Sequence, residues 1–194
     1  RQWVEEGRVP ANCGKGHQAE GLPQLVAEGV NTSMAPSNGF LCTTCHTNFE
    51  DYARIEITEV EFPSGATVTM DDTDSNLCIS CHQGRASTAS IDRAVSDLEE
   101  DAVPDPALRF TNIHYFAAGA TLFGGEVQGA YEYADQAYVG KFAHVPGFAN
   151  CTECHGTHEL EVQTESCFTC HAGVETVDAI RGPLSTTDYD GDGA

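Results

Sequence analysis

Hydrophobic residues recur along this chain in short stretches, separated by polar and glycine-rich segments. A helix is expected in the N-terminal segment, after Pro23, from four aliphatic residues at helical spacing: Leu22, Leu25, Val26 and Val30. Residues 54–70 alternate between apolar and polar positions around a Pro-Ser-Gly turn, which predicts a β-hairpin. A second helix is expected over residues 88–98, and a second hairpin from the pairing of residues 126–133 with 138–142. The pattern favours a mostly irregular chain with short helices and one or two β-hairpins.

The composition provides little material for a conventional hydrophobic core. Of the 194 residues, 40% are hydrophobic and 8% are aromatic, and 19 are glycine. Something other than side chains is therefore expected to fill part of the interior. The weakly polar stretch over residues 113–125 is too short to span a membrane, so no membrane insertion is expected. The chain begins at Arg1 without a signal-peptide pattern, as a mature, processed form would.

The chain has a strongly negative net charge, which limits the kinds of molecule it can bind. Thirty acidic and nine basic residues give a formal net charge of −21. Such a surface repels phosphate groups, which argues against nucleic acids and anionic membranes as partners. The charge is typical of a very soluble protein from an extracellular or salty setting, and docking to basic partners stays open.

Eight of the nine cysteines fall in four identical Cys-x-x-Cys-His frames. We number them motif 1 (Cys42, Cys45, His46), motif 2 (Cys78, Cys81, His82), motif 3 (Cys151, Cys154, His155) and motif 4 (Cys167, Cys170, His171). This frame is the attachment signature of c-type haem. The two thiols form thioethers with the haem vinyl groups, and the adjacent histidine becomes the proximal ligand of the iron. The motifs therefore predict four covalently bound haem c groups.

Two other uses of paired cysteines have to be weighed. Zinc ribbons also use Cys-x-x-Cys pairs, but zinc does not require a histidine directly after each second cysteine. Disulfides within such pairs are strained and reactive rather than structural. Four consecutive frames with the histidine in place favour haem over both.

The histidine count predicts how each iron is coordinated. Four histidines remain outside the motifs, one for each haem: His17, His114, His144 and His158. If each is a distal ligand, every iron has two imidazoles and no open position, so it carries electrons but does not readily bind oxygen, nitrite or peroxide. The alternative for each is an ordinary surface or core histidine.

Motifs 3 and 4 are separated by 11 residues between His155 and Cys167. A coil of that length spans roughly 20 Å, so these two haems are expected to be neighbours. His158 is too close to His155 to reach the opposite face of the same iron, and it is expected to bind an adjacent haem.

Two features lie outside the haem frames. Cys13 has no partner and, with His17, resembles a motif lacking its second thiol, although eight histidines do not suffice for a fifth bis-histidine haem. An unpaired thiol, or a bond to another molecule, is expected instead. Near the C-terminus, Asp188, Asp190 and Asp192 match the opening of a calcium loop without its later acidic ligand. Residues 1–182 are expected to form a single tetrahaem domain, and residues 183–194 an acidic tail or a partial calcium loop.

Several blocks resemble multihaem c-type cytochromes of metal-reducing microbes, and in particular the tetrahaem extracellular cytochrome nanowire family. The resemblance covers about residues 17–172, and the blocks that carry it are 39–46, 62–66, 76–85, 112–125 and 144–151. It implies a multihaem fold in which loops, short helices and hairpins wrap a stacked haem chain. It also implies that the haems are bis-histidine ligated, that subunits polymerise into a filament, and that one distal histidine near the N-terminus comes from the adjacent subunit. His17 matches that position, and His114, His144 and His158 match the internal distal ligands.

The expected function is electron transfer, without a catalytic residue, as a subunit of an extracellular cytochrome filament that exchanges electrons with other redox proteins or extracellular acceptors. One alternative is a monomeric periplasmic electron shuttle with the same haem residues. Another is a multihaem redox enzyme, which requires an iron with an open position.

Overall fold

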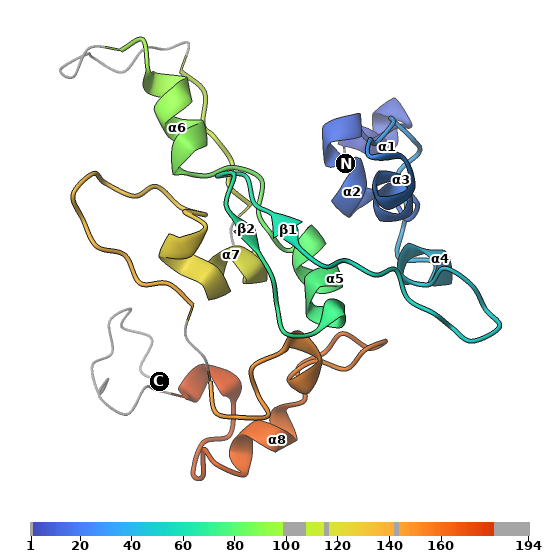
Figure 1. The fold of residues 1–194 in the computed structure, drawn as a ribbon, viewed down its shortest axis with the longest axis vertical. Helices are drawn as coiled ribbons and strands as arrows, with labels where there is room; N and C mark the ends of the chain where they lie inside the picture. Colours follow the sequence, from blue (N-terminus) through green and yellow to red (C-terminus); the bar gives the residue numbers. More distant parts are fainter. Residues whose placement is uncertain (1, 99–107, 115–116, 142–143, 181–194) are drawn as a thin grey trace. The chain divides into compact units, whose positions relative to one another are not determined.

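The computed structural model describes residues 2–98, 108–114, 117–141 and 144–180. Short helices joined by irregular segments dominate these residues, with one small sheet (Figure 1). The α-helices are α1 Gln2–Glu6, α2 Ala11–His17, α3 Gly21–Glu28, α4 Cys42–Cys45, α5 Thr73–Cys81, α6 Thr88–Val95, α7 Ala118–Phe123 and α8 Thr164–Phe168. The strands are β1 Val60–Glu61 and β2 Thr67–Val68, and the 3-10 turns are η1 Gly124–Glu126, η2 Cys151–Glu153 and η3 Val177–Ala179. The expectation of a mostly irregular chain with short helices is confirmed.

The chain divides into two compact units, residues 1–142 and 143–194. Motifs 1 and 2 lie in the first unit, together with His17 and His114. Motifs 3 and 4 lie in the second unit, together with His144 and His158. The prediction of a single domain over residues 1–182 stays a prediction, and the acidic tail lies outside the described residues.

The N-terminal helices pack closely because glycines lie where they meet. A Cβ atom on Gly21, at the start of α3, would run into the backbone of Gly14 in α2. The predicted helix after Pro23 is confirmed as α3, which ends at Gly29 in a left-handed conformation with φ of 73°. Gln18 is buried beneath these helices, and its side-chain amide donates to the carbonyl of Val9 at 3.3 Å.

The predicted hairpin between motifs 1 and 2 is confirmed as the antiparallel pair β1–β2, with Val60 opposite Val68. Its turn is closed by the amide of Phe62, which donates to the carbonyl of Ala66 at 2.8 Å. The hairpin carries one side of a small core, because Phe62 is only 2% exposed and its ring meets that of Phe123 edge-on at 5.8 Å. The buried members of this core are Val60, Phe62, Met70, Ile79, Phe123 and Val127.

Helix α5 begins at a side-chain cap and contacts β1 and α7 (Figure 1). The carboxylate of Asp72 accepts the amide of Ser75 at 2.6 Å, as N-cap residues do. Close packing of α7 depends on Gly119, whose amide donates to the carbonyl of His82 at 2.8 Å. A Cβ atom at Gly119 would lie 2.8 Å from the same carbonyl oxygen. Motif 2 is therefore held at the end of α5 by the small core and by α7.

The helix predicted over residues 88–98 is confirmed as the shorter α6, whereas the prediction of a second hairpin is wrong. In the described residues, segments 126–133 and 138–142 contain no strand. The amide of Gly125 does donate to the carbonyl of Val139 at 2.8 Å. Gln128, however, has a left-handed φ of 50°, which breaks the extended run that a ladder needs.

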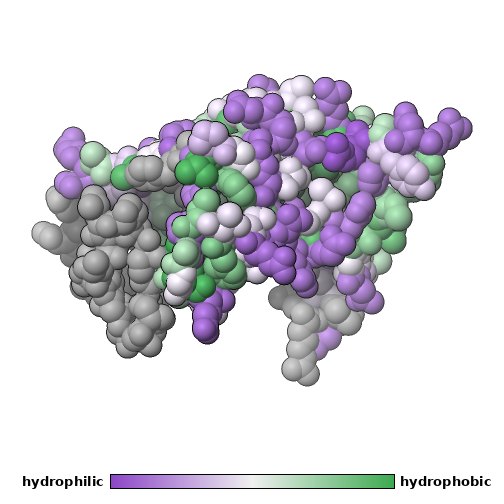
Figure 2. Space-filling view, turned by 90° about the horizontal axis from the view of Figure 1, so that it is seen from below, coloured by the Kyte–Doolittle hydropathy of each residue, from purple (hydrophilic) through white to green (hydrophobic). Residues whose placement is uncertain are grey.

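The surface is largely hydrophilic on the face drawn in Figure 2, with smaller hydrophobic areas between the polar side chains. Among the described residues, no helix is both long enough and apolar enough to span a bilayer.

Candidate haem attachment sites

All four Cys-x-x-Cys-His motifs fold into the same single turn. In each, the histidine amide donates a hydrogen bond to the carbonyl of the first cysteine, four residues earlier. The N–O distances are 2.9 Å in motif 1, 3.1 Å in motif 2, 2.9 Å in motif 3 and 2.9 Å in motif 4. The turns belong to different elements: α4, the end of α5, η2 with the residues after it, and α8 with the residues after it.

This turn gives the motifs the geometry that haem attachment requires. Residues three and four apart in a helical turn are neighbours on one face. The two thiols of a motif and its histidine therefore share a face, where a planar group can join both sulfurs while the imidazole binds its metal. The residues present fit haem c in all four places.

In motif 1, a loop returns to the histidine and holds its ring. Nδ1 of His46 lies 2.7 Å from the carbonyl oxygen of Tyr52, a hydrogen bond in which the ring nitrogen donates. Tyr52 has a left-handed φ of 55°, which turns its carbonyl toward the ring. The loop is closed by the amide of Ile55, which donates to the carbonyl of Cys45 at 2.8 Å. We call residues 47–55 the return loop of motif 1.

Motif 3 has the same return loop, shorter by one residue, over residues 156–163. Nδ1 of His155 lies 3.1 Å from the carbonyl oxygen of Leu160, whose φ is 59°. The amide of Gln163 donates to the carbonyl of Cys154 at 2.8 Å, as Ile55 does to the second cysteine of motif 1. Each histidine also forms a β-bridge to its loop, His46 with Arg54 and His155 with Val162.

These loops fix the histidine tautomer. When Nδ1 carries the proton and donates to a carbonyl, Nε2 keeps its lone pair free for a metal. The same bond fixes the ring orientation and makes the imidazole a stronger electron donor to the metal. Sequence reasoning missed both carbonyls, because Tyr52 and Leu160 carry no residue signal for a left-handed backbone.

Motifs 2 and 4 continue differently. Two residues after each histidine comes a glycine with a left-handed backbone, Gly84 with φ of 82° and Gly173 with φ of 91°. Within the part of the chain that the structure describes, the rings of His82 and His171 make no hydrogen bond. The four motifs therefore alternate along the chain between two local designs.

Neither of the two alternatives to haem gains support from the placement of the cysteines. All nine lie among the described residues, and none forms a disulfide. Burial raises the pKa of the Cys45, Cys81 and Cys154 thiols, which disfavours the thiolate form that binds metals. In the described ranges no three His, Cys, Asp or Glu side chains converge as a metal site would need, and the zinc alternative gains no support.

Within each unit, a cysteine of one motif influences the pKa of a cysteine in the other motif. The charge of Cys45 contributes to the raised pKa of Cys81, and the charge of Cys167 contributes to that of Cys154, in both cases after the effect of burial. Electrostatic influence of this kind acts over short distances at a partly buried site. The expectation from the sequence that the haems of motifs 3 and 4 are neighbours stays a prediction.

Two of the four remaining histidines lie against each other in the first unit. The ring centres of His17 and His114 are 6.1 Å apart, and Trp3 lies edge-on to His17 at 4.8 Å. Burial, followed by the nearby charges of His114 and Arg85, lowers the pKa of His17. This favours the neutral imidazole, which is the form that binds a metal.

In the second unit, the ring of His144 lies beside that of His171 in motif 4, with their centres 6.2 Å apart and their planes tilted by 36°. His158 is exposed beside motif 3. No placement in the structure tests the distal roles of these histidines, and the roles stay predictions.

Of the two features outside the frames, the structure describes only Cys13. Cys13 is half-buried on α2 and its thiol donates to the side chain of Asn12 at 3.6 Å. The three aspartates of the calcium-like sequence, Asp188, Asp190 and Asp192, lie outside the described residues.

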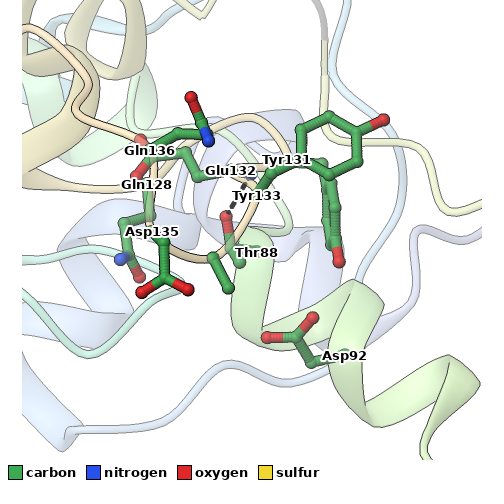
Figure 3. A pocket seen from close by; sticks show the side chains of 9 residues that line it. Thr88, Asp92, Gln128, Tyr131, Glu132, Tyr133, Asp135 and Gln136 are labelled. Atoms are coloured by element: carbon green, nitrogen blue, oxygen red, sulfur yellow. Dashed lines mark hydrogen bonds between the residues drawn. The ribbon is translucent and has the colours of Figure 1, made fainter.

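A pocket of about 360 Å³ lies between α6 and the segment after η1 (Figure 3). The hydroxyl of Thr88 accepts the amide of Glu132 at 3.0 Å, and Asp92 and Tyr131 lie beside it. Its lining contains neither cysteine nor histidine, so it offers no haem ligand.

Comparison with known proteins finds similarity to polyhaem cytochromes. The chain is 32% identical over 175 residues to the C-type polyheme cytochrome OmcB of Geobacter sulfurreducens, in two strains, across 68% of this chain. It is 33% identical over 141 residues to the C-type polyheme cytochrome OmcC of the same species, across 57% of this chain. The homology supports a multihaem c-type cytochrome.

The chain spans only about a fifth of these relatives, 22% of OmcB and 17% of OmcC. No family model matches the chain, and no solved structure matches it.

Proposed function

We propose that this chain transfers electrons through four covalently attached c-type haems. The observation that carries the proposal is the shared turn, in which the same histidine-to-cysteine hydrogen bond closes all four Cys-x-x-Cys-His motifs. The similarity to polyheme cytochromes points the same way. When bound, each haem iron supplies one-electron chemistry, and the protein sets its ligands, burial and spacing.

The small protein core supports haem as part of the interior. Large apolar side chains beside motif 1 are mostly exposed in the chain alone, between 53% and 64%: Phe40, Leu41, Phe49 and Tyr52. A porphyrin attached to Cys42 and Cys45 would cover such surface, which is costly to leave in water. On this proposal the loops and short helices wrap a haem chain.

The proposed ligation is bis-histidine at every iron, with the four motif histidines proximal and His17, His114, His144 and His158 distal. Neutral imidazoles and the surrounding carboxylates favour the ferric state, so low reduction potentials are expected. A potentiometric titration that puts all four haems well above zero would contradict this ligation.

We also propose that the protein is a subunit of a filament outside the cell. Its main partners would be further copies of the same chain. The basis is the resemblance of the sequence blocks to the nanowire family, in which His17 would serve a haem of the adjacent subunit. In the chain alone, His17 lies beside His114. The second candidate is a monomeric periplasmic shuttle whose distal ligands all come from one chain.

Electron microscopy and size exclusion of native material separate the two assemblies. The filament predicts that His17→Ala disperses long polymers and leaves three bis-histidine haems in the monomer. A mutant monomer that keeps four bis-histidine haems would exclude the inter-subunit role.

Calcium at the acidic tail is tested on the same samples by adding a chelator, which is expected to change the polymers only if the tail binds the ion.

A redox enzyme is a weaker candidate because it needs an iron with an open position. If all four irons have two imidazoles, carbon monoxide is not expected to bind the reduced protein at neutral pH. Binding of one equivalent would identify an open haem and favour the enzyme.

The central test of the proposal is the haem count. Mass spectrometry of the purified chain is expected to find the mass of four haem c groups. The double variant Cys42→Ser/Cys45→Ser should lose one, whereas Cys13→Ser should keep all four. A wild-type chain without added haem mass would overturn the proposal.

A further inference from the structure

In the second unit, a histidine outside the motifs lies opposite a proximal histidine. The ring centres of His144 and His171 are 6.2 Å apart, and their planes are tilted by 36°. His144 has a second ring contact, with Phe148, whose ring packs edge-on with its centre 6.0 Å away. The structure thus places an imidazole beside the attachment turn of motif 4.

Two imidazoles bound to one iron would have a similar separation. A metal–imidazole bond is about 2.0–2.1 Å long and the nitrogen lies about 1.1 Å from its ring centre, so two such imidazoles have centres about 6.2–6.4 Å apart. Aromatic rings in ordinary offset or edge-on contact also have their centres about 4.5–7 Å apart. The spacing is therefore compatible with two ligands of one iron but does not identify them by itself.

Distance alone does not identify an axial pair, since His17 and His114 are 6.1 Å apart. Neither of those residues belongs to a complete attachment turn. His171 does: its amide is bonded to the carbonyl of Cys167, which fixes the thiols and the imidazole on one face. The pair in the second unit combines this spacing with a haem attachment turn.

We infer that His144 and His171 bind opposite faces of one iron, that of the haem attached to Cys167 and Cys170. This inference rests on the proposed function, and it assigns one distal histidine to one haem. It also means that His144 does not serve the haem of motif 3, which lies in the same unit.

The test counts how many irons lose an axial ligand when two histidines are removed. His144→Ala alone should convert one of four low-spin irons to a high-spin, carbon monoxide-binding iron. If the residues share an iron, His144→Ala/His171→Ala should still leave three low-spin irons. Electron paramagnetic resonance of the ferric protein and carbon monoxide titration of the ferrous protein measure the count.

The matched control is His144→Ala/His155→Ala, which removes ligands from two different irons and should leave two low-spin irons. Haem content is measured by mass spectrometry in every variant. If His171→Ala prevents haem attachment at motif 4, the number of low-spin irons still tests the pairing. In that case the three remaining haems should all stay low-spin when His144→Ala is added. Where His144→Ala reduces the yield, His144→Met serves, since methionine ligation has its own absorption band.

Two low-spin irons in the His144→Ala/His171→Ala variant would overturn the pairing. Four low-spin irons in His144→Ala would overturn it as well, because His144 would then not be a ligand. Both outcomes require a haem-loaded protein, so they differ from a chain without haem, which would overturn the proposed function itself.

Discussion

The carbonyl of Tyr52 offers a way to change one haem without touching a ligand. Tyr52→Pro should break the hydrogen bond to His46, because proline fixes φ near −65° whereas Tyr52 has φ of 55°. The carbonyl would then point away from the ring. Tyr52→Gly is the matched control, since glycine accepts positive φ and both variants lose the same side chain.

The expected shift follows from the strength of that bond. A neutral hydrogen bond contributes about 0.5–1.5 kcal/mol net. For a one-electron couple, about 1.4 kcal/mol corresponds to 59 mV. Only the difference between the ferric and ferrous states counts, so we expect the midpoint potential of one haem to rise by roughly 20–40 mV in Tyr52→Pro. The sign is upward because losing the bond makes the imidazole of His46 a weaker donor, which destabilises the ferric iron.

Spectropotentiometry of the wild type and of both variants at one pH and ionic strength measures the shift. Tyr52→Gly should follow the wild-type curve closely, and Tyr52→Pro should displace one of four components. Nuclear magnetic resonance of the paramagnetic haem methyl groups shows whether a single haem is affected. Equal potentials in the proline and glycine variants would refute a role of this carbonyl in tuning the haem.

Four further substitutions test the packing and capping of the helices and the small core, each measured by denaturant unfolding at equal haem content. Phe62→Ala removes a ring that is 2% exposed and should cost about 3–5 kcal/mol. Gly119→Ala should cost about 1–3 kcal/mol, because its Cβ would lie 2.8 Å from the carbonyl oxygen of His82. The same change at Gly16, where nothing lies within 4 Å, should be neutral or stabilising by up to about 1 kcal/mol. Asp72→Ala removes the N-cap of α5 and should lower the free energy of unfolding by about 1 kcal/mol. Unchanged unfolding midpoints in the Phe62, Gly119 and Asp72 variants would contradict these packing and capping assignments.

Periodicity identified the elements whose stability depends on an apolar pattern. It located α3, the hairpin β1–β2 and α6, because their buried residues recur at the spacing of a helix or a strand. It did not locate α2, where two glycines lower helix propensity and packing against α3 compensates. It placed a hairpin after η1 because Tyr and Val favour strands, but the left-handed backbone at Gln128 overrides that propensity.

The four Cys-x-x-Cys-His frames can be identified from the sequence because haem attachment through thioethers requires a fixed spacing of the thiols and the histidine. Their common turn is a consequence of the same spacing, since three and four residues correspond to one turn of helix. The partners of the ring nitrogens were not readable. They are backbone carbonyls of Tyr52 and Leu160, and any residue type supplies a carbonyl.

Identical frames therefore do not make equivalent sites. In motifs 1 and 3 the return loop holds Nδ1 of the histidine, so the proximal ring is oriented by the protein before a metal binds. In motifs 2 and 4 the chain turns away at a glycine, and the ring of His82 or His171 is left to be oriented by the metal and by its opposite ligand. A histidine whose Nδ1 donates to a carbonyl is a stronger electron donor and stabilises the ferric state. The haem of motif 1 should therefore have a lower reduction potential than that of motif 2, and the haem of motif 3 a lower one than that of motif 4. An electron entering either unit would then settle first on the haem of motif 2 or motif 4, which makes those two the expected sites of the first reduction.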